Sequence, residues 1–143
     1  MSFDLVVWHT SKPITEQQAR AAIDQLLKEP PPTKGEPANV TALYNELTAK
    51  WPEIDNVPPE HEGDFDYSPW SFAIQRLGPG LLMHCVFAKG HTVANHVLDL
   101  TRKHGLVFYD LQDTYIDIPE SLLKPPSSPA PPEPPKPWYK KFF

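Results

Sequence analysis

The predicted fold depends on residues 71–88, which have the sequence SFAIQRLGPGLLMHCVFA. Two apolar runs, 71–77 and 81–88, flank the short segment Gly78-Pro79-Gly80. Apolar runs joined by a short glycine-containing loop predict a β-hairpin. In the second run, apolar residues occupy both alternating sets of positions, which is typical of a strand buried on both faces. We therefore expect residues 81–88 to form a central strand.

The segments on either side of this hairpin alternate between strand and helix patterns. Residues 3–9 are rich in valine and aromatic residues and predict a strand. Thr15 and Gln18 have the spacing of a capping box that opens a helix. Asn39 is the expected N-cap of the second helix, and Gly105 is expected to end the third. The remaining elements expected are helices at 16–28, 40–51 and 92–104, a strand at 106–110, and residues 114–118 as its continuation or as a short fifth strand.

The order of these elements predicts the fold class. Removing the helix at 40–51 leaves the order βαββαβ, which is the ferredoxin-like or split βαβ unit. We expect an α+β domain over residues 1–124, with an insertion at about 30–70 that contains the extra helix and an acidic loop. Its sheet should have four mainly antiparallel strands, with helices 16–28 and 92–104 on one face. The other face would be covered by proline-rich segments, by a second copy or by a partner.

Residues 51–70, here called the acidic loop, contain six acidic residues and no lysine or arginine, in a chain whose net charge is −5. Four prolines in this segment disfavour a helix or a central strand. The loop is either a solvated surface or a docking surface for a basic protein partner. The residues expected to bind that partner are the acids and three possible aromatic anchors: Glu53, Asp55, Glu60, Glu62, Asp64 and Asp66, with Trp51, Tyr67 and Trp70.

Residues 125–143 form a proline-rich tail that ends in Trp138-Tyr-Lys-Lys-Phe-Phe143. Eight prolines between positions 125 and 137 predict an extended polyproline II segment. The four terminal aromatic residues can dock on the domain itself or form a flexible arm that binds a partner. A ligand of the PxxP type for an adaptor domain is the third interpretation.

Composition excludes several classes of protein. The sequence pI of about 5.6 argues against nucleic acid as a partner, because phosphate backbones require clustered basic residues. No apolar run reaches the ~18 residues of a membrane span. The first residues lack the basic region of a signal peptide, and the single cysteine, Cys85, cannot form an internal disulfide. We therefore expect a cytoplasmic protein of unknown oligomeric state.

Catalytic chemistry has little support in the sequence. His84 and Cys85 are adjacent in a predicted strand, so their side chains point to opposite faces. His91 and His96 are separated by five positions, which is not the spacing of a helical zinc pair. The apolar neighbours of Cys85 indicate a buried, inert thiol. We expect no catalytic residue, metal or cofactor.

Short motifs along most of the chain resemble those of small uncharacterised bacterial proteins that begin with a Met-Ser-Tyr-Asp-Leu type of strand. The similar motifs are the opening MSFDLVVW, Trp51-Pro52 before the acidic loop, Trp70-Ser71 before the hairpin, the segment Gly105-Leu-Val-Phe-Tyr-Asp110, and the proline-rich aromatic ending. Members of that group look like antitoxins or immunity proteins that neutralise a cognate toxin by direct binding.

The resemblance thus implies a non-enzymatic immunity protein, whose acidic surface would bind the basic active-site face of a toxin. The alternative is a small-molecule-binding or catalytic ferredoxin-like domain, dimeric through its open sheet face. In that case His84 and Trp8 would line a pocket on the face that the helices leave uncovered.

Overall fold

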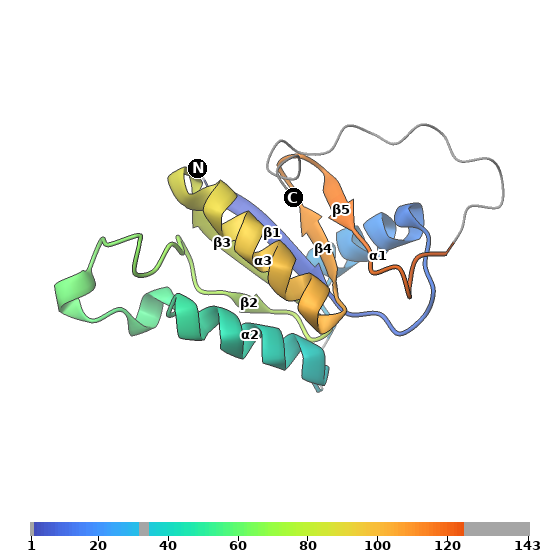
Figure 1. Ribbon diagram of the computed structural model, residues 1–143, viewed down its shortest axis with the longest axis horizontal. Coiled ribbons are helices and arrows are strands. Elements are labelled where there is room, and N and C mark those ends of the chain that lie inside the picture. Colours follow the sequence, from blue (N-terminus) through green and yellow to red (C-terminus); the bar gives the residue numbers. More distant parts are fainter. Residues whose placement is uncertain (1, 32–34, 125–143) are drawn as a thin grey trace.

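The computed structural model, which describes residues 2–31 and 35–124, has an α+β fold with three α-helices and a five-stranded antiparallel sheet. The strands follow the order β2-β3-β1-β4-β5 across the sheet (Figure 1). The acidic loop projects from one end of the molecule, on the left of Figure 1. Among the described helices, none has the length and apolar character needed to cross a membrane.

Two long strands form the centre of the sheet. Strands β1 (Ser2–Trp8) and β3 (Gly80–Val86) each have seven residues and pair antiparallel along their whole length. Strand β4 (Val107–Asp110) pairs with the other side of β1, and β5 (Tyr115–Asp117) pairs with β4. The two outer strands are the shortest, because β2 (Gln75–Arg76) has two residues and β5 has three. The separate fifth strand confirms one of the two alternatives for residues 114–118.

The turn of the hairpin is confirmed, but its first arm is shorter than predicted. Gly78 has a φ of +86°, which favours glycine, and a Cβ on Gly80 would lie only 2.5 Å from the carbonyl oxygen of Val7. The expected strand at 71–77 is wrong in its extent, because only Gln75–Arg76 pair there as a strand. Before that point the chain contacts β3 through an isolated bridge between Trp70 and Cys85. The first arm therefore has two short contacts with β3 instead of one continuous ladder.

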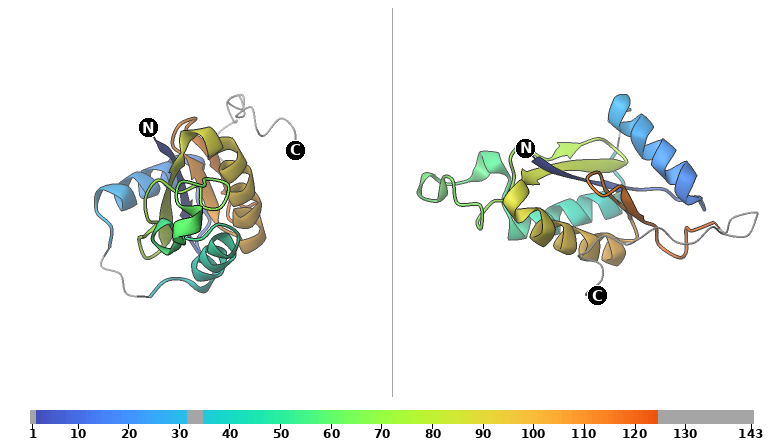
Figure 2. Two further views of the ribbon diagram at one scale, coloured as in Figure 1. Left: turned by 90° about the vertical axis from the view of Figure 1, so that its left-hand side faces the viewer. Right: turned by 90° about the horizontal axis from the view of Figure 1, so that it is seen from above.

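Helices cover both faces of the sheet. Helices α2 (Ala38–Lys50) and α3 (Gly90–His104) pack on the face that carries Leu5 and Val7. Helix α1 (Glu16–Lys28) lies on the opposite face, where its Ile23 packs with Val6 and Val107 (Figure 2, right). The expectation that helices 16–28 and 92–104 share one face is therefore wrong. The periodicity of a helix shows which of its own sides is buried, but it does not show which face of a sheet that side covers. With five strands and helices on both faces, the ferredoxin-like topology is not confirmed.

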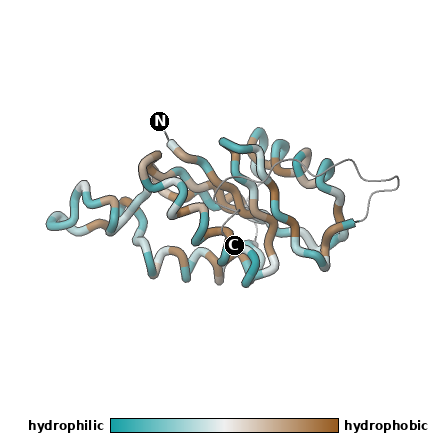
Figure 3. Tube along the Cα trace, turned by 45° about the horizontal axis from the view of Figure 1, so that its top comes forward, coloured by the Kyte–Doolittle hydropathy of each residue, from teal (hydrophilic) through white to brown (hydrophobic). Residues whose placement is uncertain are grey.

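The hydrophobic core has a larger and a smaller part on the two faces. The larger part lies between the sheet and helices α2 and α3 and includes Trp51 and Trp70 from the two ends of the acidic loop. The smaller part lies under α1. Figure 3 shows the hydrophobic residues gathered along the central strands, whereas the projecting loop is mostly hydrophilic. The loop is thus fixed to the core at both ends.

The helix ends agree only partly with the sequence. Thr15 and Gln18 form the expected capping box, and Gly105, with a φ of +69°, ends α3. Helix α2, however, begins at Ala38 with Pro37 as N-cap, so Asn39 is not the cap. Its side-chain Nδ2 instead donates to the carbonyl oxygen of His104 at 3.2 Å, which ties α2 to the end of α3.

Candidate functional site: the acidic loop

The acidic loop connects the end of α2 to the bridge at Trp70. It contains two single-turn 3₁₀ helices, η1 (Ile54–Asn56) and η2 (Pro59–His61). Prolines flank these turns and prevent a longer helix, since each proline removes a backbone donor. Short hydrogen-bonded turns therefore give the loop its shape. The contacts of its side chains then distinguish the part that belongs to the domain from the part that faces solvent.

Two tryptophans close the base of the loop. Trp51 is 8% exposed and Trp70 is fully buried, and their rings meet edge to face at 6.2 Å. The Trp70 Nε1–H donates to the carbonyl oxygen of Trp51 at 3.1 Å, and the Ser68 hydroxyl donates to the carbonyl oxygen of Pro52 at 2.7 Å. The structure therefore places two of the three predicted aromatic anchors, Trp51 and Trp70, in the core beneath the loop, where they hold its two ends together.

Glu53 is also part of the base. Its Oε2 accepts a hydrogen bond from the Tyr44 hydroxyl at 2.8 Å, and its Oε1 accepts one from the backbone N–H of Ile74 at 2.8 Å. Burial, followed by the hydrogen bond to Glu53, raises the pKa of Tyr44 above its ordinary value. One carboxylate thus joins the loop to helix α2 and to the chain just before β2.

Asp64 and Asp66 stabilise the second half of the loop. Asp64 Oδ1 accepts from the backbone N–H groups of Asp66 at 3.1 Å and Tyr67 at 3.3 Å. Asp64 Oδ2 lies 3.5 Å from Nδ1 of His61, whose ring stacks on Tyr67 with centroids 4.1 Å apart. Asp66 forms an ion pair with Lys89. Both aspartates and Tyr67 are therefore engaged within the domain, although Asp66 remains largely exposed.

The other three acids are exposed and have no partner among the described residues. Asp55, Glu60 and Glu62 form no hydrogen bond or ion pair through their side chains with any residue that the structure describes. Ile54 and Phe65, on the same part of the loop, are 38% and 45% exposed. We call these five residues the outer surface of the loop. It combines three free carboxylates with exposed apolar side chains.

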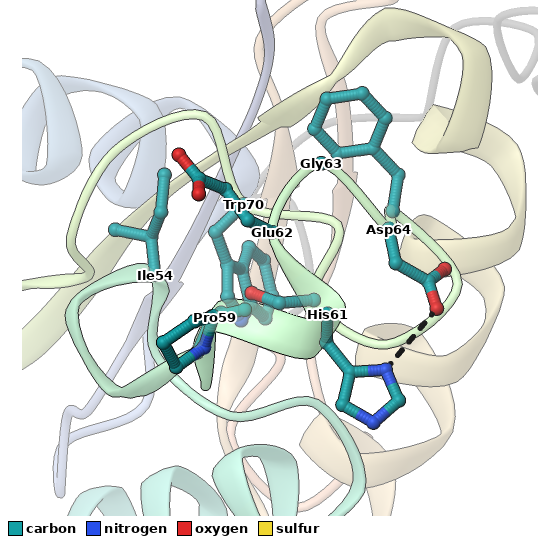
Figure 4. Close-up of a pocket in the computed structure, with 10 residues that line it drawn as sticks. Ile54, Pro59, His61, Glu62, Gly63, Asp64 and Trp70 are labelled. Carbon is teal, nitrogen blue, oxygen red and sulfur yellow. Dashed lines mark ion pairs between the residues drawn. The ribbon is translucent and has the colours of Figure 1, made fainter.

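A pocket of about 370 Å³ lies within the loop. Figure 4 shows Trp70 in the middle of the pocket, the Glu62 carboxylate on one side and the ion pair of His61 and Asp64 on the other. Its lining residues come from the loop and its last turn: Ile54, Val57, Pro59, His61, Glu62, Gly63, Asp64, Phe65, Ser68 and Trp70. Sequence reasoning gave no sign of this pocket, since its shape depends on how the two 3₁₀ turns fold over the indole ring.

The residues of the alternative hypothesis lie on the α1 face of the sheet. Trp8 packs against the smaller core, and Nδ1 of His84 lies at hydrogen-bond distance, 2.6 Å, from Oδ1 of Asp4. The pocket in the loop contains neither Trp8 nor His84. Cys85 points to the opposite face, where burial, followed by the charge of Asp4, raises the pKa of its thiol to about 12. Within residues 2–31 and 35–124, no group of three or more His, Cys, Asp or Glu side chains is arranged to hold a metal ion.

The contacts that order the loop were not visible in the sequence. The partners of Glu53 and Asp66 lie up to 23 positions away, at Tyr44, Ile74 and Lys89. No local motif reports such pairs, because they form only when the domain folds.

The predicted tail contacts of residues 125–143 lie outside the described residues. No protein-family model, curated protein or solved structure gives a significant match to this chain.

Proposed function

We propose that this protein is a bacterial immunity or antitoxin-type protein, which neutralises a cognate toxin by direct binding and has no catalytic activity of its own. The acidic loop is the docking surface. The observation that carries the proposal is that Asp55, Glu60 and Glu62 are exposed, without a partner in the described part of the chain, on a loop whose base is held by buried contacts. The partner is a basic protein that acts in the same compartment, the cytoplasm.

A pre-ordered loop is suited to binding because little conformational entropy is lost when the partner docks. Hydrogen bonds from Trp70, Ser68 and Tyr44 fix the base, so the outer carboxylates project from an anchored loop. Carboxylates on a fixed surface attract a positively charged protein, raise the association rate and disfavour acidic competitors. The exposed side chains of Ile54 and Phe65 provide apolar contact area beside that charge.

The environment of Cys85 supports a binding role over a role as a nucleophile. A thiol whose pKa is raised to about 12 stays protonated at neutral pH and is a poor nucleophile.

We also propose that the sheet is a variant of the ferredoxin-like unit, extended by β5 and by a helix on its second face.

A small-molecule-binding or dimeric domain is the second candidate. One observation favours it: Phe72 is 61% exposed and lies edge-on to His84, with ring centroids 5.7 Å apart, on the face that α1 covers. Exposed aromatic area of this kind suits a second copy or an apolar ligand. A concentration-dependent dimer that Phe72→Ser abolishes would favour this candidate over the immunity function.

The test of the proposed function uses a toxin candidate encoded next to this gene. The full chain should restore growth to cells that express the candidate and should bind it rapidly at low salt. A triple variant, Asp55→Asn, Glu60→Gln and Glu62→Gln, should reduce the association rate at least ~10-fold at low ionic strength, because charge steering typically accounts for factors of 10 or more. Its melting temperature should be unchanged, since none of the three side chains has a described partner.

The matched control removes the same three charges elsewhere. Asp24, Glu29 and Glu120 are exposed and their side chains form no described contact, so Asp24→Asn, Glu29→Gln and Glu120→Gln have an equal effect on net charge. Equal loss of rate in both variants would show that only net charge matters. Full rate and full protection in the loop variant would reject the acidic loop as the docking surface.

A further inference from the structure

The pocket in the acidic loop is lined by both apolar and charged side chains. Ile54 and Val57 contribute apolar surface, and Phe65 adds an aromatic ring that is 45% exposed, whereas Trp70 is fully buried. Glu62 contributes a carboxylate with no described partner. An apolar cavity with a free carboxylate at its edge is complementary to a side chain that has a long apolar stem and a cationic head.

We propose that this pocket receives one arginine side chain of the partner, a proposal that rests on the docking function of the loop. Arginine fits better than lysine because its planar guanidinium stacks on aromatic rings while it donates hydrogen bonds to a carboxylate. Phe65 provides the exposed aromatic ring, and Glu62 accepts the hydrogen bonds. The arginine acts as the anchor of the interface, and the surrounding acids set its long-range attraction.

The charge of the pocket argues against anionic occupants. Its volume of about 370 Å³ leaves room for one long side chain. An anionic group would lie against the carboxylates of Glu62 and Asp64. Asp64 is less available than Glu62 because its Oδ1 already accepts two backbone N–H groups and its Oδ2 faces His61. Glu62 is therefore the specific acceptor.

The experiment is a titration of the isotopically labelled full chain with the tripeptide acetyl-Gly-Arg-Gly-amide, observed by NMR at constant ionic strength. The indole N–H of Trp70, which donates to the carbonyl of Trp51, and the backbone amides of residues 61–65 should shift in a saturable manner. The same peptide with citrulline in place of arginine keeps the shape and removes the charge. It should bind at least about fivefold more weakly. Equal shifts with both peptides would overturn the proposal.

Two variants and one matched control locate the contact. Glu62→Gln should weaken binding of the arginine peptide about threefold to fivefold, and Phe65→Ala should weaken it about threefold through loss of stacking. Glu60→Gln removes an equal charge from an exposed residue that does not line the pocket, so affinity should stay within about a factor of two. If Glu60→Gln and Glu62→Gln behave alike, the loop attracts arginine by diffuse charge and the pocket is not its site.

A further variant tests the chain's own basic ending as the occupant. The double variant Lys140→Gln and Lys141→Gln should leave the NMR signals of the pocket residues unchanged in the absence of peptide. A shift of the Trp70 indole signal in that variant would show that the tail fills the pocket and would overturn the proposal.

The two proposals fail separately. If the arginine peptide does not bind, but the loop triple variant still slows association with the toxin, docking depends on the outer surface without an arginine anchor. If the peptide binds and the triple variant protects cells normally, the pocket is a binding site but the immunity function of the loop is rejected.

Discussion

Glu53 and Glu62 are the same residue type in the same loop, yet their surroundings differ. Glu53 accepts hydrogen bonds at both carboxylate oxygens, one from Tyr44 and one from the backbone of Ile74. Glu62 is exposed at the edge of the pocket and has no described partner. The base of the loop, which contains Trp51, Glu53, Ser68 and Trp70, is therefore part of the folded domain, whereas the outer surface is available to another molecule.

This difference shows that the number of acidic residues in a segment overstates the negative charge that is available to bind a partner. Glu53, Asp64 and Asp66 satisfy donors within the domain, so half of the six acids are left without a partner among the residues that the structure describes. The engaged acids still matter for binding, because they hold the free ones in place. Substitutions at the base should thus change stability, and substitutions at the outer surface should change association.

The largest effect on stability is expected at Trp70. Trp70→Ala removes a fully buried indole and its hydrogen bond to Trp51, which should lower the free energy of unfolding by about 3–5 kcal/mol. Chemical denaturation followed by circular dichroism measures this change. Phe72→Ala is the control, because Phe72 is 61% exposed and its removal should cost far less. Similar losses in both variants would mean that the base of the loop is not part of the cooperative core.

A smaller effect is expected at Glu53. Glu53→Ala leaves the Tyr44 hydroxyl and the Ile74 N–H without an acceptor, which should cost about 1–3 kcal/mol. Asp55→Ala, two positions along the same loop, should change stability by less than about 0.5 kcal/mol. A double-mutant cycle with Tyr44→Phe isolates the pair, and a coupling energy near zero would show that Glu53 does not act through Tyr44.

The smallest effect depends on pH and concerns Glu36, which supports the base from outside the loop. Glu36 accepts hydrogen bonds from Arg76, whose guanidinium lies 4.0 Å from the Tyr44 ring centroid. The hydrogen bond to Arg76 lowers the pKa of Glu36 below its ordinary value of 4.5, despite partial burial, which acts in the opposite direction. Because the folded-state pKa is lowered, the stabilisation is fully present above 4.5 and is lost as the pH falls through the lowered value.

Melting temperatures of wild type and Glu36→Gln test this linkage. The wild-type advantage at pH 7 should shrink steadily below about pH 4.5. Glu29→Gln, at an exposed residue whose side chain has no described contact, should show no such trend. A wild-type advantage that persists unchanged at pH 2 would contradict the assignment of the stabilisation to the charged carboxylate of Glu36.

Local sequence signals predicted the elements of the fold well but not their arrangement. The hairpin turn at Gly78, the capping box at Thr15 and the end of α3 at Gly105 each depend on residues close in sequence. The placement of α1 on the opposite face from α3 depends on long-range packing of Ile23 against Val6 and Val107. The apolar side of a helix can be buried equally well on either face of a sheet, so its periodicity alone could not show which face α1 covers.

At the candidate site, too, the sequence predicted local features but not the tertiary contacts. Composition identified the acidic loop and its exposed acids, because charged residues among prolines rarely enter a core. It could not separate Trp51 and Trp70, which are buried, from Phe65, which is exposed. An aromatic residue near a charged segment can belong to the core or to an interface, and only the tertiary contacts distinguish the two cases.

The short outer strands have a consequence for behaviour at high concentration. The edge of a sheet carries unpaired N–H and C=O groups that can pair with another chain and start aggregation. Here β2 offers two residues at one edge and β5 offers three at the other, while the seven-residue strands β1 and β3 lie inside. Arg76 on β2 and Asp117 on β5 add charge at these edges. These two described edges thus offer little backbone for intermolecular β-pairing, which should limit aggregation at high protein concentration.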